Sequence, residues 1–174
     1  MKREYKKLPH IDRVGDYQFV TIRTQDSLDS YLQKIESFDI SSAKKQMAID
    51  GYLDNFAKGR YFEGEVLVYF RSFLLSLDKK LFELVAFSIM PNHLHILFCQ
   101  KEELSKTMKI VKGGSASGIN KILNKNGKFW ASGYYDKAIR DEKHFEVVYN
   151  YIRNNPLKAG LKDMDRRFWH VYGV

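Results

Sequence analysis

The stretch FSIMPNHLHILF, residues 87–98, places two histidines one residue apart between two apolar runs. In a β-strand, side chains two positions apart project from the same face, so His93 and His95 stand side by side while Leu94 and Ile96 point the other way. Two imidazoles in this arrangement could bind a divalent cation. The same pattern also fits a half-buried strand whose histidines face the surface, so the pair alone decides nothing.

A second group of polar side chains lies in DEKHFEVVYNYIRNNPLKAGL, residues 141–161. Its apolar residues recur at helical spacing, and Tyr149 falls on that stripe as a core aromatic. Tyr151 lies off the stripe and Asn155 follows it by four residues, so we expect both on one edge of the helix. The alternatives are a rim tyrosine whose hydroxyl meets water and an asparagine that caps the helix before Pro156.

Together these side chains could form one site for phosphodiester chemistry. Two imidazoles and an amide oxygen can hold a divalent cation with open positions, and a tyrosine beside them can supply an oxygen nucleophile. The cation would polarise the scissile phosphate and help align the leaving oxygen. A tyrosine nucleophile would leave the protein joined covalently to one DNA end, so a free hydroxyl could later reverse the reaction. Such chemistry suits strand transfer better than degradation.

The elements that must position these residues follow from hydrophobic periodicity and turn signals. They are, in chain order, a strand over 17–24, two or three helices over 27–77 broken near 41–42 and 59–64, strands over 81–90 and 93–99, a helix over 102–123 loosened at Gly113-Gly114, a strand over 134–140, and a helix from 142 that ends before Pro156. The two central strands, joined across Pro91-Asn92, predict an antiparallel hairpin. This order predicts an α+β fold: a ferredoxin-like (RRM-like) antiparallel sheet with helices packed on it, plus a helical insertion over 27–77.

Length and composition favour one domain over residues 1–174. The chain has 174 residues, 44% of them hydrophobic, which is a globular composition with no apolar run near the roughly 20 residues of a membrane span. The N-terminus is basic but lacks the features of a signal peptide, and Cys99 is the single cysteine. We therefore expect a soluble cytoplasmic protein with no membrane partner.

The charge of the chain points to a polyanionic partner such as nucleic acid. The net charge is +8, and residues 101–128 carry seven lysines against Glu102 and Glu103. Phe129, Trp130 and Tyr134 could stack on bases, although core packing is the alternative for the first two. The residues predicted to contact DNA phosphates are Lys106, Lys109, Lys112, Lys121, Lys125, Arg140 and Arg153.

Three segments resemble a known family. MPNHLHILF is similar to the His-hydrophobic-His signature of HUH single-strand DNA transposases and nucleases. FWASGYYDKAIRDEKHFEVVYNYIRNNPLKAGL resembles the C-terminal half of the one-tyrosine insertion-sequence transposases, especially the REP-associated tyrosine transposases. The KIVKGGSASGINK helix resembles the segment between them. The clear resemblance covers residues 86–161.

This resemblance implies roles for four residues. His93 and His95 match the two metal ligands, Tyr151 matches the nucleophile that forms a 5′-phosphotyrosine bond, and Asn155 matches the polar residue that completes the metal site. The family implies magnesium or manganese as cofactor and single-stranded DNA with a hairpin as partner. A homodimer, in which the tyrosine helix of one chain completes the site of another, is possible.

Three alternatives stay open at the level of sequence. The first is a catalytically silent nucleic-acid-binding module on the same sheet, and the second is hydrolysis of a small phosphoester by water. The third concerns the nucleophile, because a shifted alignment would make Tyr134 or Tyr135 a competitor of Tyr151. The helices over 27–77 have no assigned role.

Overall fold

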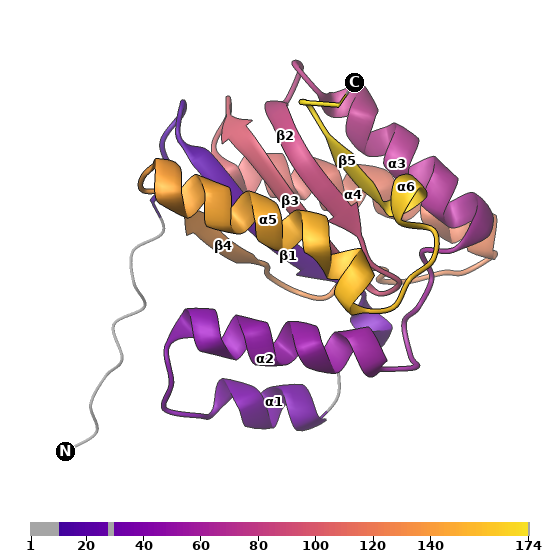
Figure 1. Cartoon of the computed structure of the whole chain (residues 1–174). Coiled ribbons are helices and arrows are strands. Elements are labelled where there is room, and N and C mark those ends of the chain that lie inside the picture. The colour runs from indigo at the N-terminus through magenta and orange to yellow at the C-terminus, as the bar shows by residue number, and fades with distance from the viewer. Residues whose placement is uncertain (1–10, 28–29, 174) are drawn as a thin grey trace.

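Five strands form the sheet that carries the predicted site residues (Figure 1). The computed structural model describes residues 11–27 and 30–173. Its strands are β1 (Tyr17–Arg23), β2 (Phe82–Ile89), β3 (His93–Gln100), β4 (Tyr135–Ala138) and β5 (Phe168–His170). They lie in the order β4-β1-β3-β2-β5, and all neighbours are antiparallel. The first four strands and their helices follow the ferredoxin-like β-α-β-β-α-β pattern, so the predicted fold class is confirmed.

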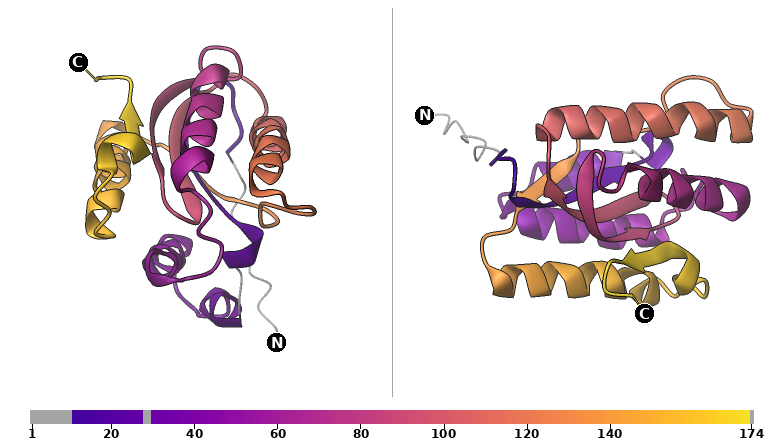
Figure 2. Two further views of the ribbon diagram at one scale, coloured as in Figure 1. Left: turned by 90° about the vertical axis from the view of Figure 1, so that its right-hand side faces the viewer. Right: turned by 90° about the horizontal axis from the view of Figure 1, so that it is seen from above.

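Helices cover both faces of this sheet. They are, after a short 3₁₀ helix (Gln25–Ser27), α1 (Ser30–Glu36), α2 (Ser42–Asn55), α3 (Gly64–Leu77), α4 (Leu104–Leu123), α5 (Glu142–Lys158) and α6 (Met164–Arg167). Figure 2 shows α3 and α4 on one face, α5 on the other, and α1 with α2 beside one end of the sheet. Among the described residues, no helix has the length and apolar character that crossing a membrane would require.

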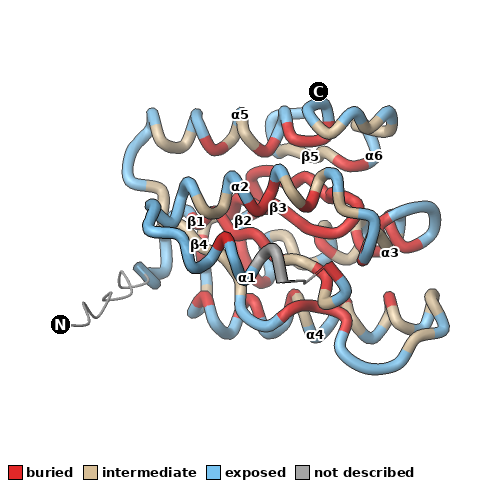
Figure 3. Tube along the Cα trace, turned by 90° about the horizontal axis from the view of Figure 1, so that it is seen from below, coloured by how far each residue is buried: buried red, intermediate tan, exposed pale blue. Residues whose placement is uncertain are grey.

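The central hairpin of β2 and β3 is buried on both faces, which explains its long apolar runs (Figure 3). Alternation along β3 sends Leu94 and Ile96 into the larger core beneath α3 and α4. Leu97 points the other way, into a smaller core that includes Ile152 of α5. His93 and His95 share the face of Leu97, so the strand period directs both imidazoles toward the α5 layer.

The helical interpretation of residues 27–77 is confirmed for the residues that the structure describes, and residues 28–29 lie outside them. The breaks fall where they were predicted. Ser41 caps α2 by accepting a hydrogen bond from the backbone N–H of Lys44. The segment that could be mistaken for a strand forms α3, because Val66, Leu67 and Phe70 share a buried helical face.

Two predictions about helix continuity are wrong. The helix α4 runs unbroken through Gly113-Gly114, because Met108, Val111 and Ile119 bury its apolar face and offset the roughly 1 kcal/mol that each glycine costs. The helix α5 continues past Pro156 to Lys158. A proline this close to the helix end removes one backbone donor without breaking the remaining turn, and its ring is buried.

Candidate metal and nucleophile site

The two histidines of β3 lie side by side in the interior. Their ring centroids are 4.8 Å apart, and both side chains are fully buried. The reading in which the pair faces solvent is therefore wrong. Since an uncompensated buried imidazole is unfavourable, each ring needs partners for its nitrogens.

His93 is held in one tautomer by the turn that precedes it. The side-chain N–H of Asn92 donates to the carbonyl of Leu53 at 2.9 Å, which fixes the amide oxygen of Asn92 on the other side, 2.7 Å from Nδ1 of His93. That oxygen can only accept, so Nδ1 of His93 carries the proton. The lone pair of His93 therefore resides on Nε2, which has no hydrogen-bond partner.

His95 is oriented by the neighbouring strand. Thr21 of β1 stands opposite His95 in the sheet register, and its hydroxyl lies 2.8 Å from Nδ1 of the ring. Nε2 of His95 is buried without a hydrogen-bond partner, as is Nε2 of His93. Outer partners that fix a ring while leaving one nitrogen free are typical of histidines that bind metals.

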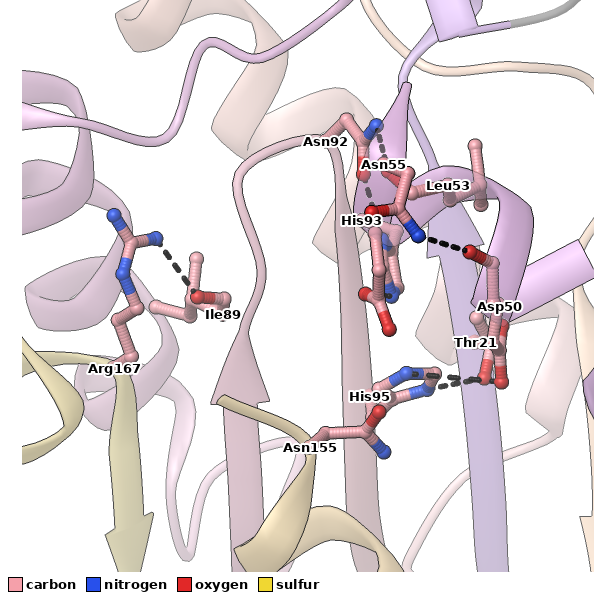
Figure 4. A network of polar contacts seen from close by, with 12 residues as sticks. Thr21, Asp50, Leu53, Asn55, Ile89, Asn92, His93, His95, Asn155 and Arg167 are labelled. Carbon is pink, nitrogen blue, oxygen red and sulfur yellow. Dashed lines mark hydrogen bonds and ion pairs between the residues drawn. The ribbon is translucent and has the colours of Figure 1, made fainter. Parts of the chain in front are cut away.

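Two carboxylates from α2 complete this group, and the sequence analysis missed both. Oδ2 of Asp50 lies 3.8 Å from Nε2 of His95, and Oδ1 of Asp54 lies 3.9 Å from Nε2 of His93. Asp50 and Asp54 are four residues apart on one helix, and Asp50 follows the buried Ile49. An aspartate beside the apolar residue Ile49 was the available signal in the sequence, and Figure 4 shows Asp50 beside the histidines.

Tyr151 of α5 reaches the same group. Its hydroxyl donates a short hydrogen bond to Oδ2 of Asp50, and its ring centroid lies 5.3 Å from that of His95. Gln46 holds the other oxygen of Asp50 at 2.7 Å. The hydroxyl of Tyr151 thus contacts a carboxylate beside the histidines. The alternative, a tyrosine at the helix rim whose hydroxyl meets water, is wrong.

Asn155 lies one turn after Tyr151 and is buried. Its side-chain N–H donates to the backbone carbonyl of Tyr151 at 2.9 Å, which ties the two residues together inside the helix. The capping role before Pro156 is wrong, because α5 continues to Lys158. Figure 4 shows Asn155 on the α5 side of His95, and its role as a ligand stays a prediction.

Burial dominates the electrostatics of the group. It lowers the pKa of His95 to about 3 and that of His93 well below its ordinary value, so both rings are neutral at pH 7. Burial also raises the pKa of Asp50 to about 7 and that of Asp54 to about 6. The pKa of Tyr151 is raised, first by burial and then by the charge of Asp50. Neutral imidazoles are the form that binds metal ions.

The donor set fits a divalent cation. One ligand atom each from Asp50, His93 and His95 lies within 4.8 Å of the others, and the two Nε2 atoms have no hydrogen-bond partner. Two imidazoles with one carboxylate form a mixed nitrogen and oxygen set that suits manganese better than a purely imidazole pair would. The two Nε2 atoms, which are buried and lack hydrogen-bond partners, are thus atoms that an ion would engage.

The predicted DNA-contacting lysines lie in the other layer, four of them on α4 and Lys125 just after its end. Lys106 pairs with Glu102 at 2.8 Å, and Lys125 pairs with Asp26 at 2.8 Å. Lys112 donates to two backbone carbonyls of the loop before β4. The remaining predicted cations, Lys109, Lys121, Arg140 and Arg153, are exposed. All seven contacts with DNA stay predictions.

Two of the aromatic residues predicted to stack on bases lie in the larger core, apart from the site. Phe129 and Trp130 are each 3% exposed and pack on Phe62 in the larger core, which excludes them as platforms for bases. Tyr134 and Tyr135 are half-buried, one just before β4 and the other at its first position. Of the three tyrosines considered as nucleophile, Tyr151 is the one beside His95.

Comparison with known proteins agrees with this geometry. Residues 57–155 match the family described as "Transposase IS200 like". An "Uncharacterized protein" of Haemophilus influenzae is 30% identical over 94 residues, with 41% of this chain and 52% of that protein covered. The chain therefore spans about half the length of this curated relative.

A solved structure is also similar in fold. It is described as the REP-associated tyrosine transposase bound to a REP hairpin. The match has a TM-score of 0.49 and 16% sequence identity, and it covers 89% of this chain and 74% of that chain. The family match spans more than half of the chain and includes β3 and most of α5, which carry the histidines, Tyr151 and Asn155. The chain therefore belongs to the IS200-like transposase family.

Proposed function

We propose that this protein cuts and rejoins single-stranded DNA at a hairpin or palindromic repeat through a covalent bond to Tyr151. The observation that carries the proposal is the contact of the Tyr151 hydroxyl with Asp50, beside two buried imidazoles whose Nε2 atoms have no hydrogen-bond partner. A nucleophile, a proton acceptor and a set of metal ligands thus meet at one point. Family membership supports DNA strand transfer as the reaction class.

In this proposal, the oxygen of Tyr151 attacks the scissile phosphate. A bond forms between phosphorus and the tyrosine oxygen, and the bond from phosphorus to the 3′-oxygen breaks. The 3′-oxygen takes a proton from water and becomes a 3′-hydroxyl, and the other DNA end is left as a 5′-phosphotyrosine. Asp50, which accepts the hydrogen bond of the phenol, is positioned to take its proton. The reverse attack by a 3′-hydroxyl rejoins the strand and releases the tyrosine.

His93, His95 and Asp50 would hold a magnesium or manganese ion, with Asn155 as a further candidate ligand. Such an ion supplies charge stabilisation for the phosphate. Thr21 and Asn92 keep the two rings turned with Nε2 toward it. The net charge of +8 favours approach of the polyanionic substrate.

The test is an adduct assay with hairpin oligonucleotides that carry single-stranded flanks, drawn from repeats around the gene itself. Each oligonucleotide is labelled at its 5′ or its 3′ end, incubated with protein and manganese, and run on a denaturing gel. We expect a slow-migrating adduct that carries the 3′ label and a free fragment that carries the 5′ label. The adduct should disappear in Tyr151→Phe and His93→Ala.

Tyr149→Phe is the matched control, because Tyr149 lies two residues earlier on α5 and bonds to His170 instead. It should form the adduct at the wild-type level. Cleavage that survives Tyr151→Phe would replace the proposal by hydrolysis with water. Salt-sensitive binding without an adduct on any hairpin would favour the silent binding module.

A further inference from the structure

A pocket of about 340 Å³ lies between α2, the end of β1 and the loop before β4. One wall is formed by Lys45 and Gln46 of α2, another by Thr21 and Arg23 of β1, and the third by residues 132–135. Its volume is within the range of small-ligand sites. Nothing in the proposed reaction uses this pocket.

The pocket adjoins the nucleophile through two of its own wall residues. Thr21 bonds to His95, and Gln46 bonds to Asp50, which in turn accepts the hydroxyl of Tyr151. A molecule that touches Thr21 and Gln46 is therefore one side chain away from the site of attack. A DNA strand whose phosphate lies at Tyr151 and that runs toward α2 would place a neighbouring nucleotide close to this pocket.

The chemistry of the walls fits a nucleotide. Tyr134 and Tyr135 are half-buried and line the pocket, and an aromatic ring in a pocket wall can contact a base. Arg23 and Lys45 are held together at the rim, since Glu36 pairs with Arg23 at 3.3 Å and its carbonyl accepts from Lys45 at 2.8 Å. An exposed ion pair of this kind is weak, so a phosphate can compete for both cations.

The loop that carries the aromatic residues is fixed in place. Lys112 of α4 donates to the carbonyls of Ala131 and Gly133, each at 2.8 Å, and Tyr135 pairs with Thr21 in the sheet. Gly133 has a φ of +69° and open space where a Cβ would lie. The wall is thus preformed, with an open side for a backbone to approach.

We propose that this pocket binds one unpaired nucleotide that flanks the scissile phosphate, with its base on Tyr134 and a phosphate on Arg23 and Lys45. The position of that nucleotide relative to the cleaved bond rests on the proposed function, whereas its binding does not. The pocket then helps to select which phosphate reaches Tyr151.

The test measures binding of hairpin oligonucleotides in EDTA, so that no strand is cut. Fluorescence anisotropy gives the dissociation constant for the intact strand and for strands in which each flanking base in turn is replaced by an abasic site. We expect one abasic position to weaken wild-type binding by about fivefold to a hundredfold, the usual range for loss of a stacked base. The same lesion should change binding by less than about twofold in Tyr134→Leu, because the partner is already absent.

Matched variants separate stacking and charge from general effects. Tyr134→Phe keeps the ring and should bind like wild type. Lys45→Ala should weaken binding severalfold, whereas Lys44→Ala, the same change at the adjacent exposed position outside the pocket, should not. These surface changes keep the proposal testable if Tyr134→Leu fails to fold.

Either of two results would overturn the pocket as a nucleotide site. The first is a loss of affinity at each abasic site that is equal in wild type and Tyr134→Leu. The second is equal binding by Lys45→Ala and Lys44→Ala. The adduct assay separates this failure from failure of the proposed function. If an adduct forms but the effect of the abasic site does not depend on Tyr134, the tyrosine chemistry is supported and the nucleotide site is rejected. If the effect depends on Tyr134 but no adduct forms, the nucleotide site is supported and the tyrosine chemistry is rejected.

Discussion

At the scale of single residues, the buried carboxylate of Asp50 lowers the free energy of unfolding of the metal-free protein when it is charged. Its pKa is raised to about 7 by burial, while an unfolded aspartate titrates near 4. Folding therefore binds a proton between these two pH values, so the destabilisation grows over that range and is complete above pH 7. We expect Asp50→Asn to raise the melting temperature in EDTA by several degrees at pH 8 and by less at pH 5.

The same substitution should weaken binding of Mn²⁺ by about tenfold or more, because it removes the one charged ligand of the set. Calorimetry with Mn²⁺ measures this loss. Glu146→Gln removes an exposed carboxylate from α5 and should change neither quantity. An Asp50→Asn protein that melts lower at pH 8 than wild type would show that the carboxylate stabilises the fold, contrary to our reasoning.

The sequence could single out two pairs of residues as neighbours. His93 and His95 follow the two-residue repeat of a strand, and Tyr151 and Asn155 follow the four-residue spacing of a helix. Two residues along a strand and four along a helix are local relationships. Asp50 could not be found in this way. It lies more than 40 positions before the histidines, and only the packing of α2 beside the end of the sheet brings it to His95.

At the scale of elements, the close packing of α4 on α3 predicts opposite effects at two glycines. A Cβ at Gly118 would overlap the ring and hydroxyl of Tyr69, whereas at Gly113 it would meet open space. We expect Gly118→Ala to destabilise the protein by about 1–3 kcal/mol through overpacking. Gly113→Ala should stabilise it by roughly 0.5–1 kcal/mol through helix propensity.

Urea denaturation of the two variants measures both effects on one helix. Each variant is thus the control for the other, since the chemical change is the same. Equal stabilisation by both alanines would mean that the ring of Tyr69 moves aside freely and that α4 does not depend on this close approach.

The long elements were predictable because apolar residues recur along them for several turns or strand repeats. The hairpin of β2 and β3 and the helix α3 follow from such patterns. The short α6 and β5 were missed, since three or four residues carry no measurable period. The continuation of α5 through Pro156 depends on burial of that ring, which the local sequence does not reveal.

At the scale of the whole molecule, the site is assembled within one chain. Tyr151 of α5 reaches Asp50 of α2 and the ring of His95 in β3 without help from a second copy. In the proposed reaction, exchange of the tyrosine helix between chains is therefore not needed to bring Tyr151 beside His95. The possible homodimer stays a prediction that sedimentation can test.

The difference in burial between β3 and α2 also predicts how a metal ion would change the local stability of each element. In α2, the buried residues are Ile49, Asp50 and Leu53, whereas β3 is buried along almost its whole length. Backbone amides of α2 should therefore exchange with solvent deuterium faster than those of β3. Since Asp50 would join the ion to His93 and His95, we expect Mn²⁺ to slow exchange in α2 and to leave β3 nearly unchanged.

Hydrogen exchange measured by mass spectrometry, with and without Mn²⁺, compares peptides from the two segments in one experiment. In the double variant Asp50→Asn, Asp54→Asn, the histidines remain but both carboxylates of α2 that face them are lost, so Mn²⁺ should no longer slow exchange in that helix. If Mn²⁺ raises the melting temperature of the wild type and yet leaves exchange in α2 unchanged, the ion is held without Asp50. The third ligand would then have to come from the α5 side of the site, where Asn155 lies, and α2 would serve to hold Tyr151 and not the metal.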